Sequence, residues 1–264
     1  VHADPCMWLD ALELVFSRLA QSSVEMSDIV AVSGSGQQHG SVYLDESFAD
    51  TVGNLDPRGT LKGQILSHLT RQTAPIWMDS STTVECGEIT RALGGDQEVC
   101  SRSGSIAIER FTGPQIRRFA KTSYDGWELT GVVHLVSSFM ASVLAGKSVA
   151  IDHGDGAGMN LLNLASGGWD DELLEATAPG LRAKLPSPDP DADDPIPSLR
   201  SPAVAASSVA RVSALAFALR SSRAAPLPSR LSSCCRKSTF GQMVASRLLV
   251  RTEGTRRMRR RRRR

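Results

Sequence analysis

The distribution of charge divides this chain into two unlike parts. Residues 196–264 carry seventeen Lys and Arg side chains and a single acid, Glu253, whereas residues 1–195 carry thirteen bases and twenty-seven acids. The overall net charge of +2 therefore combines +16 in the second part with −14 in the first. Like charges at this density repel one another and do not enter a packed core. We therefore expect a folded domain in the first part alone.

The composition changes at almost the same place as the charge. After about Leu185 the hydrophobic periodicity fades, and Pro, Ser, Ala and Arg dominate, with closely spaced prolines that are typical of a linker. We predict one domain over residues 1–187 and a low-complexity, disordered segment over residues 188–264, which we call the basic tail.

The basic tail has two interpretations. A changed reading frame, a retained intron or a wrongly assigned gene end explains the abrupt change most simply. The alternative is a genuine arm that binds RNA or DNA phosphates, because the arginine-rich run at residues 256–264 attracts any polyanion in a salt-dependent way. No aromatic residues interleave these arginines and no recognised nucleic-acid-binding module accompanies them, so the sequence favours non-specific binding over an evolved role.

Hydropathy and cysteine usage both favour a cytoplasmic protein. No stretch approaches the roughly 18 uninterrupted apolar residues of a membrane helix, and no basic segment followed by a short apolar one opens the chain as a secretion signal would. The cysteines lack the paired spacing of a zinc site, so we expect no metal and reduced thiols. These cysteines are Cys6, Cys86, Cys100, Cys234 and Cys235.

Helix and strand patterns near the start predict an α/β fold. The apolar residues at helical spacing there are Trp8, Leu12, Val15 and Leu19. They predict an amphipathic helix with Asp4 as its cap. The short apolar run at residues 28–33 is typical of a strand buried on both faces, and it leads into a Gly-rich loop at residues 34–40. Ligands of such sheets bind beyond the carboxyl ends of the strands, so this loop is a candidate site.

Three later segments extend the α/β pattern. Residues 74–78 predict a second buried strand whose end faces the same pocket. The apolar stripe over residues 135–144 predicts a helix that stops at Gly146. Residues 169–176 predict another helix, which Pro179 and the glycine after it interrupt.

Neutral hydrogen-bonding side chains concentrate in the Gly-rich loop. Gln38 and His39 lie between glycines, where the backbone lets a ligand come close, and such groups suit the hydroxyls of a polyol. The alternative is a loop whose amides and imidazole satisfy neighbouring backbone groups, and without further context that alternative is favoured.

Three further residues have both a functional and a structural interpretation. Trp77 could form an apolar wall against a sugar ring or belong to the core. Arg110 could donate to several hydroxyls or form a surface ion pair with Glu109. Asp155, in a Gly-rich loop, could act as a general base or stabilise a tight turn. For each residue taken alone, the structural interpretation has at least equal weight.

Four motifs together resemble one known family. They are residues 33–43 (SGSGQQHGSVY), 75–82 (PIWMDSST), 109–113 (ERFTG) and 155–162 (DGAGMNLL). In this order and spacing they resemble the FGGY family of carbohydrate kinases, and within it the eukaryotic xylulose kinases. The resemblance covers roughly residues 5–187 and rests on several independent motifs.

The resemblance implies a ribonuclease-H-like fold of the actin and hexokinase type. It implies an incomplete N-terminal, sugar-binding domain of an enzyme that phosphorylates D-xylulose, or a similar ketopentose, with ATP and magnesium. Matched motif by motif, it implies that His39 and Arg110 contact the sugar. It places Gln38 beside His39, and it makes Trp77 a wall of the sugar pocket.

The same resemblance assigns no catalytic residue to this chain. The family's general base lies in a Gly-Asp-Asn or Gly-Asp-Gln segment well after the loop that contains Asp155, and no such segment follows that loop. Phosphoryl transfer also needs magnesium ligands and a cradle for the triphosphate, which the family places before Val1 and after Leu185. We therefore expect a chain that does not itself phosphorylate the sugar. The alternative function is that of a sugar-binding pseudoenzyme.

Overall fold

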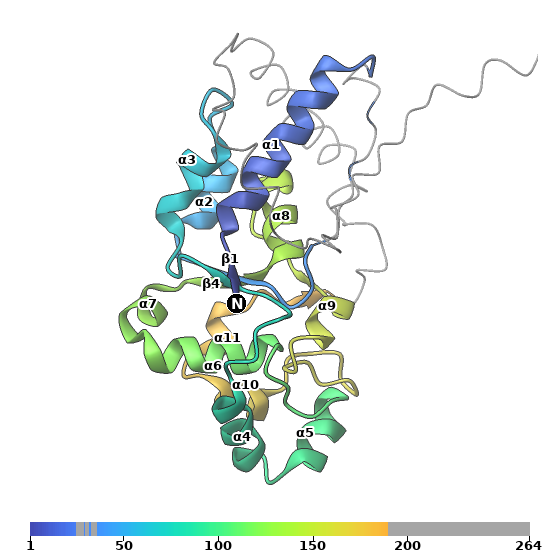
Figure 1. Ribbon diagram of the computed structural model, residues 1–264. Coiled ribbons are helices and arrows are strands. Elements are labelled where there is room, and N and C mark those ends of the chain that lie inside the picture. Colours follow the sequence, from blue (N-terminus) through green and yellow to red (C-terminus); the bar gives the residue numbers. More distant parts are fainter. Residues whose placement is uncertain (25–28, 30–31, 33–35, 190–264) are drawn as a thin grey trace, which may run out of the picture.

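The computed structural model describes residues 1–24, 29, 32 and 36–189 (Figure 1). Its strands are β1 (His2–Ala3), β2 (Ser41–Leu44), β3 (Ala74–Pro75), β4 (Val132–Leu135), β5 (Ile151–Asp152) and β6 (Pro188–Asp189). Its α-helices are α1 (Pro5–Gln21), α2 (Phe48–Gly53), α3 (Leu61–Ile65), α4 (Thr83–Ala92), α5 (Asp96–Ser103), α6 (Thr112–Thr122), α7 (Tyr124–Leu129), α8 (Val136–Ala145), α9 (His153–Ala157), α10 (Asp171–Thr177) and α11 (Leu181–Lys184). A 3₁₀ turn, η2 (Leu66–His68), follows α3. The basic tail from residue 190 onward, and most of the strand predicted at residues 28–33, lie outside the described residues.

The described strands form three two-stranded sheets. β2 and β4 pair antiparallel, with Ser41 opposite Leu135 and Leu44 opposite Val132. β1 and β3 are also antiparallel, whereas β5 and β6 are parallel. Every residue of β2 is buried, so the β2–β4 pair lies at the centre of the fold. The mixture of helices and strands confirms the predicted α/β class.

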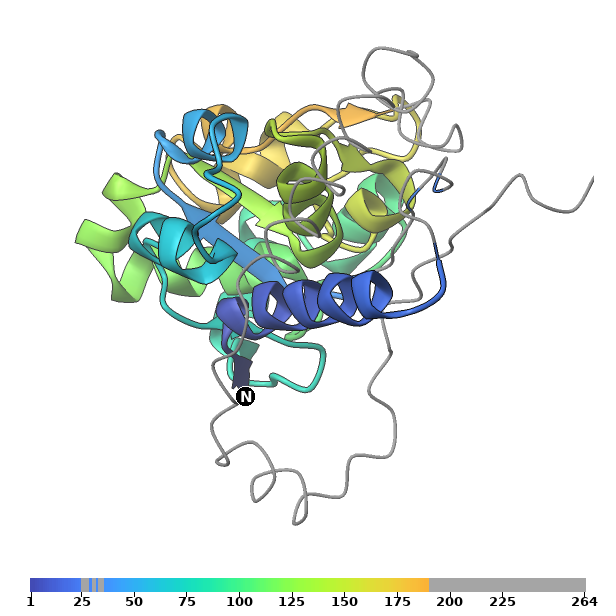
Figure 2. The same cartoon turned by 90° about the horizontal axis from the view of Figure 1, so that it is seen from above.

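The β2–β4 pair separates two hydrophobic cores. Successive side chains of a strand point to opposite faces. Tyr43 and Val133 therefore enter one core, whereas Val42 and Leu44 enter the other. Figure 1 shows α1, α2, α3 and α8 on one side of the pair, with α4, α5, α6 and α10 on the other. Seen from above in Figure 2, α1 lies along one side of the molecule.

The first helix begins where the sequence predicts, but it buries a different face. The Asp4 carboxylate accepts a hydrogen bond of 2.9 Å from the backbone N–H of Cys6 and caps α1. The expected face is wrong at Val15, which is exposed. The stripe that packs into the core runs instead through Leu9 and Phe16, the residues that directly follow Trp8 and Val15. Trp8 is only partly buried, at the edge of this stripe. The buried residues of α1 are Pro5, Cys6, Leu9, Leu12, Phe16 and Ala20.

Two predicted helix boundaries are confirmed. α8 ends at Gly146, whose φ of 67° is in the left-handed region that glycine adopts at little cost. α10 begins after Asp170, whose carboxylate accepts a hydrogen bond of 3.0 Å from the backbone N–H of Leu173. It ends before Pro179, as the sequence predicts.

The strand predicted over residues 74–78 is wrong beyond Pro75. After this residue the chain turns, and the backbone N–H of Asp79 donates a hydrogen bond of 2.8 Å to the carbonyl of Ile76. The turn withdraws Trp77 and Met78 from the core and leaves them 50% and 51% exposed. The apolar run therefore reflects a short buried strand followed by a surface turn.

None of the helices in the described part of the chain is long and apolar enough to cross a membrane.

Cys6 and Cys86 are buried free thiols, and Cys100 is a partly exposed one. Burial raises the pKa of Cys86 to about 11, so this thiol stays protonated and unreactive at neutral pH. The two remaining cysteines, Cys234 and Cys235, lie outside the described residues.

Candidate functional site

A pocket opens where the loop before β2 meets the beginnings of α6, α8 and α9. It is a small recess that is partly open to solvent. Both halves of the fold contribute, because α8 belongs to one core and α6 to the other. The lining residues are Gln37, Gln38, His39, Thr112, Leu135, Ser137, Gly154, Asp155 and Gly158.

His39 is the histidine of this pocket, and its geometry holds the ring against two neighbours. Its backbone φ of 61° is in the left-handed region, which few residues other than glycine and asparagine adopt. The imidazole is hydrogen-bonded to the Gly158 carbonyl, and its centroid lies 5.1 Å from the centroid of the Phe111 ring. Burial and the nearby Arg110 lower the pKa of His39, and the Gly158 carbonyl and Asp155 only partly oppose them. At neutral pH the ring is therefore neutral and can exchange a hydrogen bond with a hydroxyl.

Arg110 is exposed and is not among the lining residues of this pocket, but its charge lies near enough to His39 to act on the imidazole. The carbon at the centre of its guanidinium lies 5.4 Å from the centroid of the Phe111 ring, on which the group rests. Phe111 thus contacts both Arg110 and His39. The surface ion pair considered for Arg110 is absent from the described residues, where Glu109 instead accepts a hydrogen bond of 3.1 Å from Thr83.

Asp155 lines the pocket but already has a partner. Its carboxylate accepts a short hydrogen bond from the Ser137 hydroxyl at the beginning of α8. Its backbone N–H donates a hydrogen bond of 3.0 Å to the side chain of Asp152, which caps α9. Asp155 therefore lies in a short helix, not in the expected Gly-rich loop. A carboxylate held in this way orients a hydroxyl more readily than it removes a proton.

Two of the predicted contacts have different positions in the structure. Gln38 lines the pocket beside His39, although its side chain is largely exposed. Trp77 is not among the lining residues, because the turn after β3 points half of its side chain to solvent. Its assignment to a sugar-facing wall stays a prediction.

Sequence reasoning missed two hydroxyl groups of the pocket. Ser137 and Thr112 each occupy the first turn of a helix, α8 and α6 respectively. Thr112 is fully buried, and its hydroxyl has no hydrogen-bond partner within the described part of the chain. Thr112 belongs to the same motif as Arg110, at residues 109–113, so the motif contains a signal for it.

One Gly-Asp-Gln segment occurs in the described residues, well before the loop that contains Asp155. Residues 95–97 spell Gly-Asp-Gln, but they begin α5, where Asp96 accepts a hydrogen bond of 3.1 Å from Thr90 away from the pocket. No group of three metal-ligating side chains converges anywhere in residues 1–24 or 36–189.

Comparison with known proteins defines the class. Residues 68–188 match the N-terminal domain of the FGGY family of carbohydrate kinases, so the chain carries an FGGY N-terminal domain. The solved structures agree on the fold. The xylulose kinase from Rhodospirillum rubrum superimposes with a TM-score of 0.56 at 18% identity, over 72% of this chain and 34% of that one. The glycerol kinase from Plasmodium falciparum does so with a TM-score of 0.53 at 14% identity, over 71% and 34%.

Within this family the chain is similar to xylulose kinases. It is 45% identical over 179 residues to xylulose kinase 2 of Arabidopsis thaliana, a match that covers 68% of this chain and 32% of the relative. It is 40% identical over 184 residues to the xylulose kinase of Rattus norvegicus, covering 70% and 34%. The chain thus spans about a third of the length of the curated relatives it matches.

Proposed function

We propose that this chain supplies the sugar-binding part of a cytoplasmic kinase that converts D-xylulose to D-xylulose 5-phosphate with ATP and magnesium. The observation that carries the proposal is a pocket in an FGGY domain where neutral His39 lies near Arg110, whose guanidinium has no acidic partner in the described residues. The similarity to xylulose kinases supports D-xylulose as the sugar.

The pocket suits an uncharged polyol. The neutral imidazole of His39 can exchange a hydrogen bond with one hydroxyl, while the guanidinium of Arg110 presents several donors in a fixed plane. The Ser137 hydroxyl and the Asp155 carboxylate, which also line the pocket, add acceptors. Such groups bind and orient a ketopentose. Because the Asp155 carboxylate is held by Ser137, we expect the chain by itself to bind sugar without phosphorylating it.

Removing either principal contact should weaken sugar binding about tenfold. A lost hydrogen bond between a ligand and a partly buried side chain costs on the order of 1.4 kcal/mol. Calorimetric titration with D-xylulose is expected to give heat with the unchanged protein and much less with His39→Ala or Arg110→Ala. Arg91→Ala, an exposed arginine on α4 outside the pocket, is the matched control and should bind normally.

Two results would contradict this proposal. Absence of heat at millimolar D-xylulose would remove sugar binding from this chain, and equal loss in Arg91→Ala would show a non-specific charge effect. Phosphate transfer by the chain with ATP, magnesium and D-xylulose would contradict the expectation that it only binds. Trp77→Ala, tested in the same titration, decides whether this half-exposed side chain contacts the sugar.

A further inference from the structure

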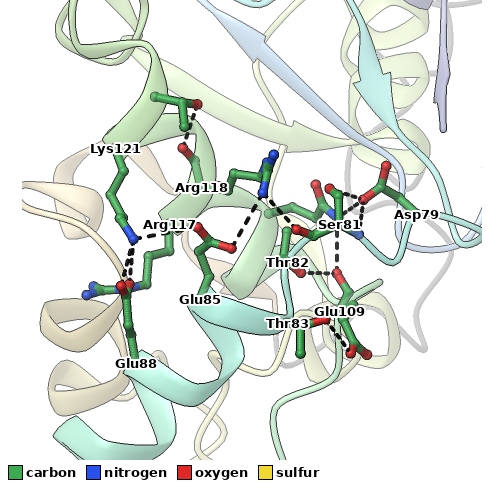
Figure 3. A network of polar contacts seen from close by, with 12 residues as sticks. Asp79, Ser81, Thr82, Thr83, Glu85, Glu88, Glu109, Arg117, Arg118 and Lys121 are labelled. Atoms are coloured by element: carbon green, nitrogen blue, oxygen red, sulfur yellow. Dashed lines mark hydrogen bonds and ion pairs between the residues drawn. The ribbon is translucent and has the colours of Figure 1, made fainter.

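The backbone carbonyl of Glu109 receives two buried hydrogen bonds immediately before Arg110. The Thr82 hydroxyl donates to this oxygen at 2.7 Å, as Figure 3 shows, and the side-chain amide of Gln115 donates to it at 3.0 Å. Thr82 and Gln115 are both completely buried. They come from different elements, the residue before α4 and the first turn of α6, so the carbonyl is fixed from two directions.

The second donor is itself held in place by a buried carboxylate. The Gln115 amide nitrogen also donates to Asp79 Oδ1 at 2.8 Å. Asp79 is 3% exposed, and the same oxygen accepts hydrogen bonds from the backbone and hydroxyl of Ser81 at 3.0 and 2.6 Å. The amide of Gln115 has only one acceptable orientation, because turning it over would place its oxygen against two acceptors. The network is therefore a rigid clamp on the Glu109 carbonyl.

The clamp lies directly before Arg110 and Phe111, two residues that neighbour the pocket residue His39. Arg110 rests on the Phe111 ring, and the same ring contacts His39. The Phe111 backbone is tied at both ends, since its N–H donates to Ile108 and its carbonyl accepts from the backbone of Gln115. A shift of Glu109 would therefore move Arg110 and Phe111 together relative to His39.

We propose that Thr82 and Gln115 are positioning residues for sugar recognition: by clamping the Glu109 carbonyl, they set the distance between Arg110 and His39. Both side chains are completely buried and neither is among the lining residues, so neither is exposed to the sugar. That the ligand is a sugar rests on the proposed function, whereas the effect of the clamp on Arg110 and His39 does not depend on it. If Thr82 and Gln115 had a purely structural role, the distance between Arg110 and His39 would be unchanged in a folded variant.

The test uses matched pairs and two readouts. Thr82→Val keeps the shape of the side chain and removes the donor, whereas Thr82→Ser keeps the donor. Gln115→Met removes the second donor at similar volume. Thr83→Val, which loses only the contact with the exposed Glu109 carboxylate, is the control. The first readout is the titration of the His39 ring by NMR without sugar, because Arg110 and Asp155 are the charges that face it. The second is D-xylulose affinity.

We expect the His39 pKa to rise toward its ordinary value in Thr82→Val and Gln115→Met, in the direction that Arg110→Ala gives. Affinity should fall about three- to tenfold in the same two variants, and Thr82→Ser and Thr83→Val should retain both properties. An unchanged His39 titration and unchanged affinity in folded Thr82→Val and Gln115→Met would overturn the inference. Absence of sugar binding in every variant would defeat the proposed function alone, because the His39 titration still decides whether the clamp positions Arg110.

Discussion

Replacing Trp127 with alanine is expected to lower the free energy of unfolding by about 3–5 kcal/mol. The indole is 1% exposed and lies edge-on to the Phe119 ring, with 6.5 Å between centroids. Its N–H donates a hydrogen bond of 3.2 Å to the Pro179 carbonyl, and the Lys184 ammonium lies 5.2 Å from the ring centroid. Trp127 therefore joins α6 and α7 to the last helices, and alanine would leave a large cavity among them. Urea denaturation monitored by circular dichroism measures the loss.

Two companion variants separate the sources of this stability. Trp127→Phe keeps most of the apolar ring and loses the N–H donor, so a cost of about 1–2 kcal/mol is expected. Tyr124→Ala, in the same short helix but 67% exposed, should change stability by no more than about 0.5 kcal/mol. A Trp127→Ala protein as stable as Tyr124→Ala would mean that α7 does not pack on this core.

Local chemistry made the helices predictable, and tertiary packing decided what local chemistry could not. Asp4 and Gly146 act through groups within four residues, so their caps could be predicted from the sequence alone, whereas the helix predicted from residue 169 begins two residues later, after its cap Asp170. The face that α1 buries depends on what lies beneath it, and spacing alone selected Val15 in place of Phe16. The apolar run at residues 74–78 predicts a strand that continues past Pro75, because a turn closed by a backbone hydrogen bond leaves no sign in hydropathy.

The candidate site was predictable where residues lie within motifs and unpredictable where distant segments meet. His39, Gln38 and Asp155 were identified from Gly-rich segments, and the structure brings all three to one pocket. That Ser137 holds the Asp155 carboxylate depends on contact between α8 and α9, which no local pattern encodes. The clamp from Thr82 likewise joins groups 27 residues apart.

Acidification below neutral pH is expected to destabilise the protein through His134. This histidine of β4 is completely buried, with its ring nitrogens 3.0 and 2.9 Å from the hydroxyls of Ser138 and Ser148 and its ring edge-on to Phe48. Burial lowers the pKa of His134 to about 3, whereas in an unfolded chain the imidazole binds the proton near its ordinary pKa of 6.5. The free energy of unfolding is therefore unaffected by protonation of His134 above pH 6.5. It declines by about 1.4 kcal/mol per pH unit as the pH falls from 6.5 toward 3.

Between pH 7 and pH 5 this linkage amounts to roughly 2 kcal/mol, a large share of a typical domain's stability. Unfolding free energies from urea titrations at both pH values should differ by about that amount in the unchanged protein and by much less in His134→Gln, which cannot take up the proton. His39, whose pKa is also lowered, contributes in the same direction. The comparison therefore includes His39→Gln, which should keep most of the dependence. A His134→Gln protein with the full pH dependence would show that another group, and not the histidine between the two cores, couples folding to protons.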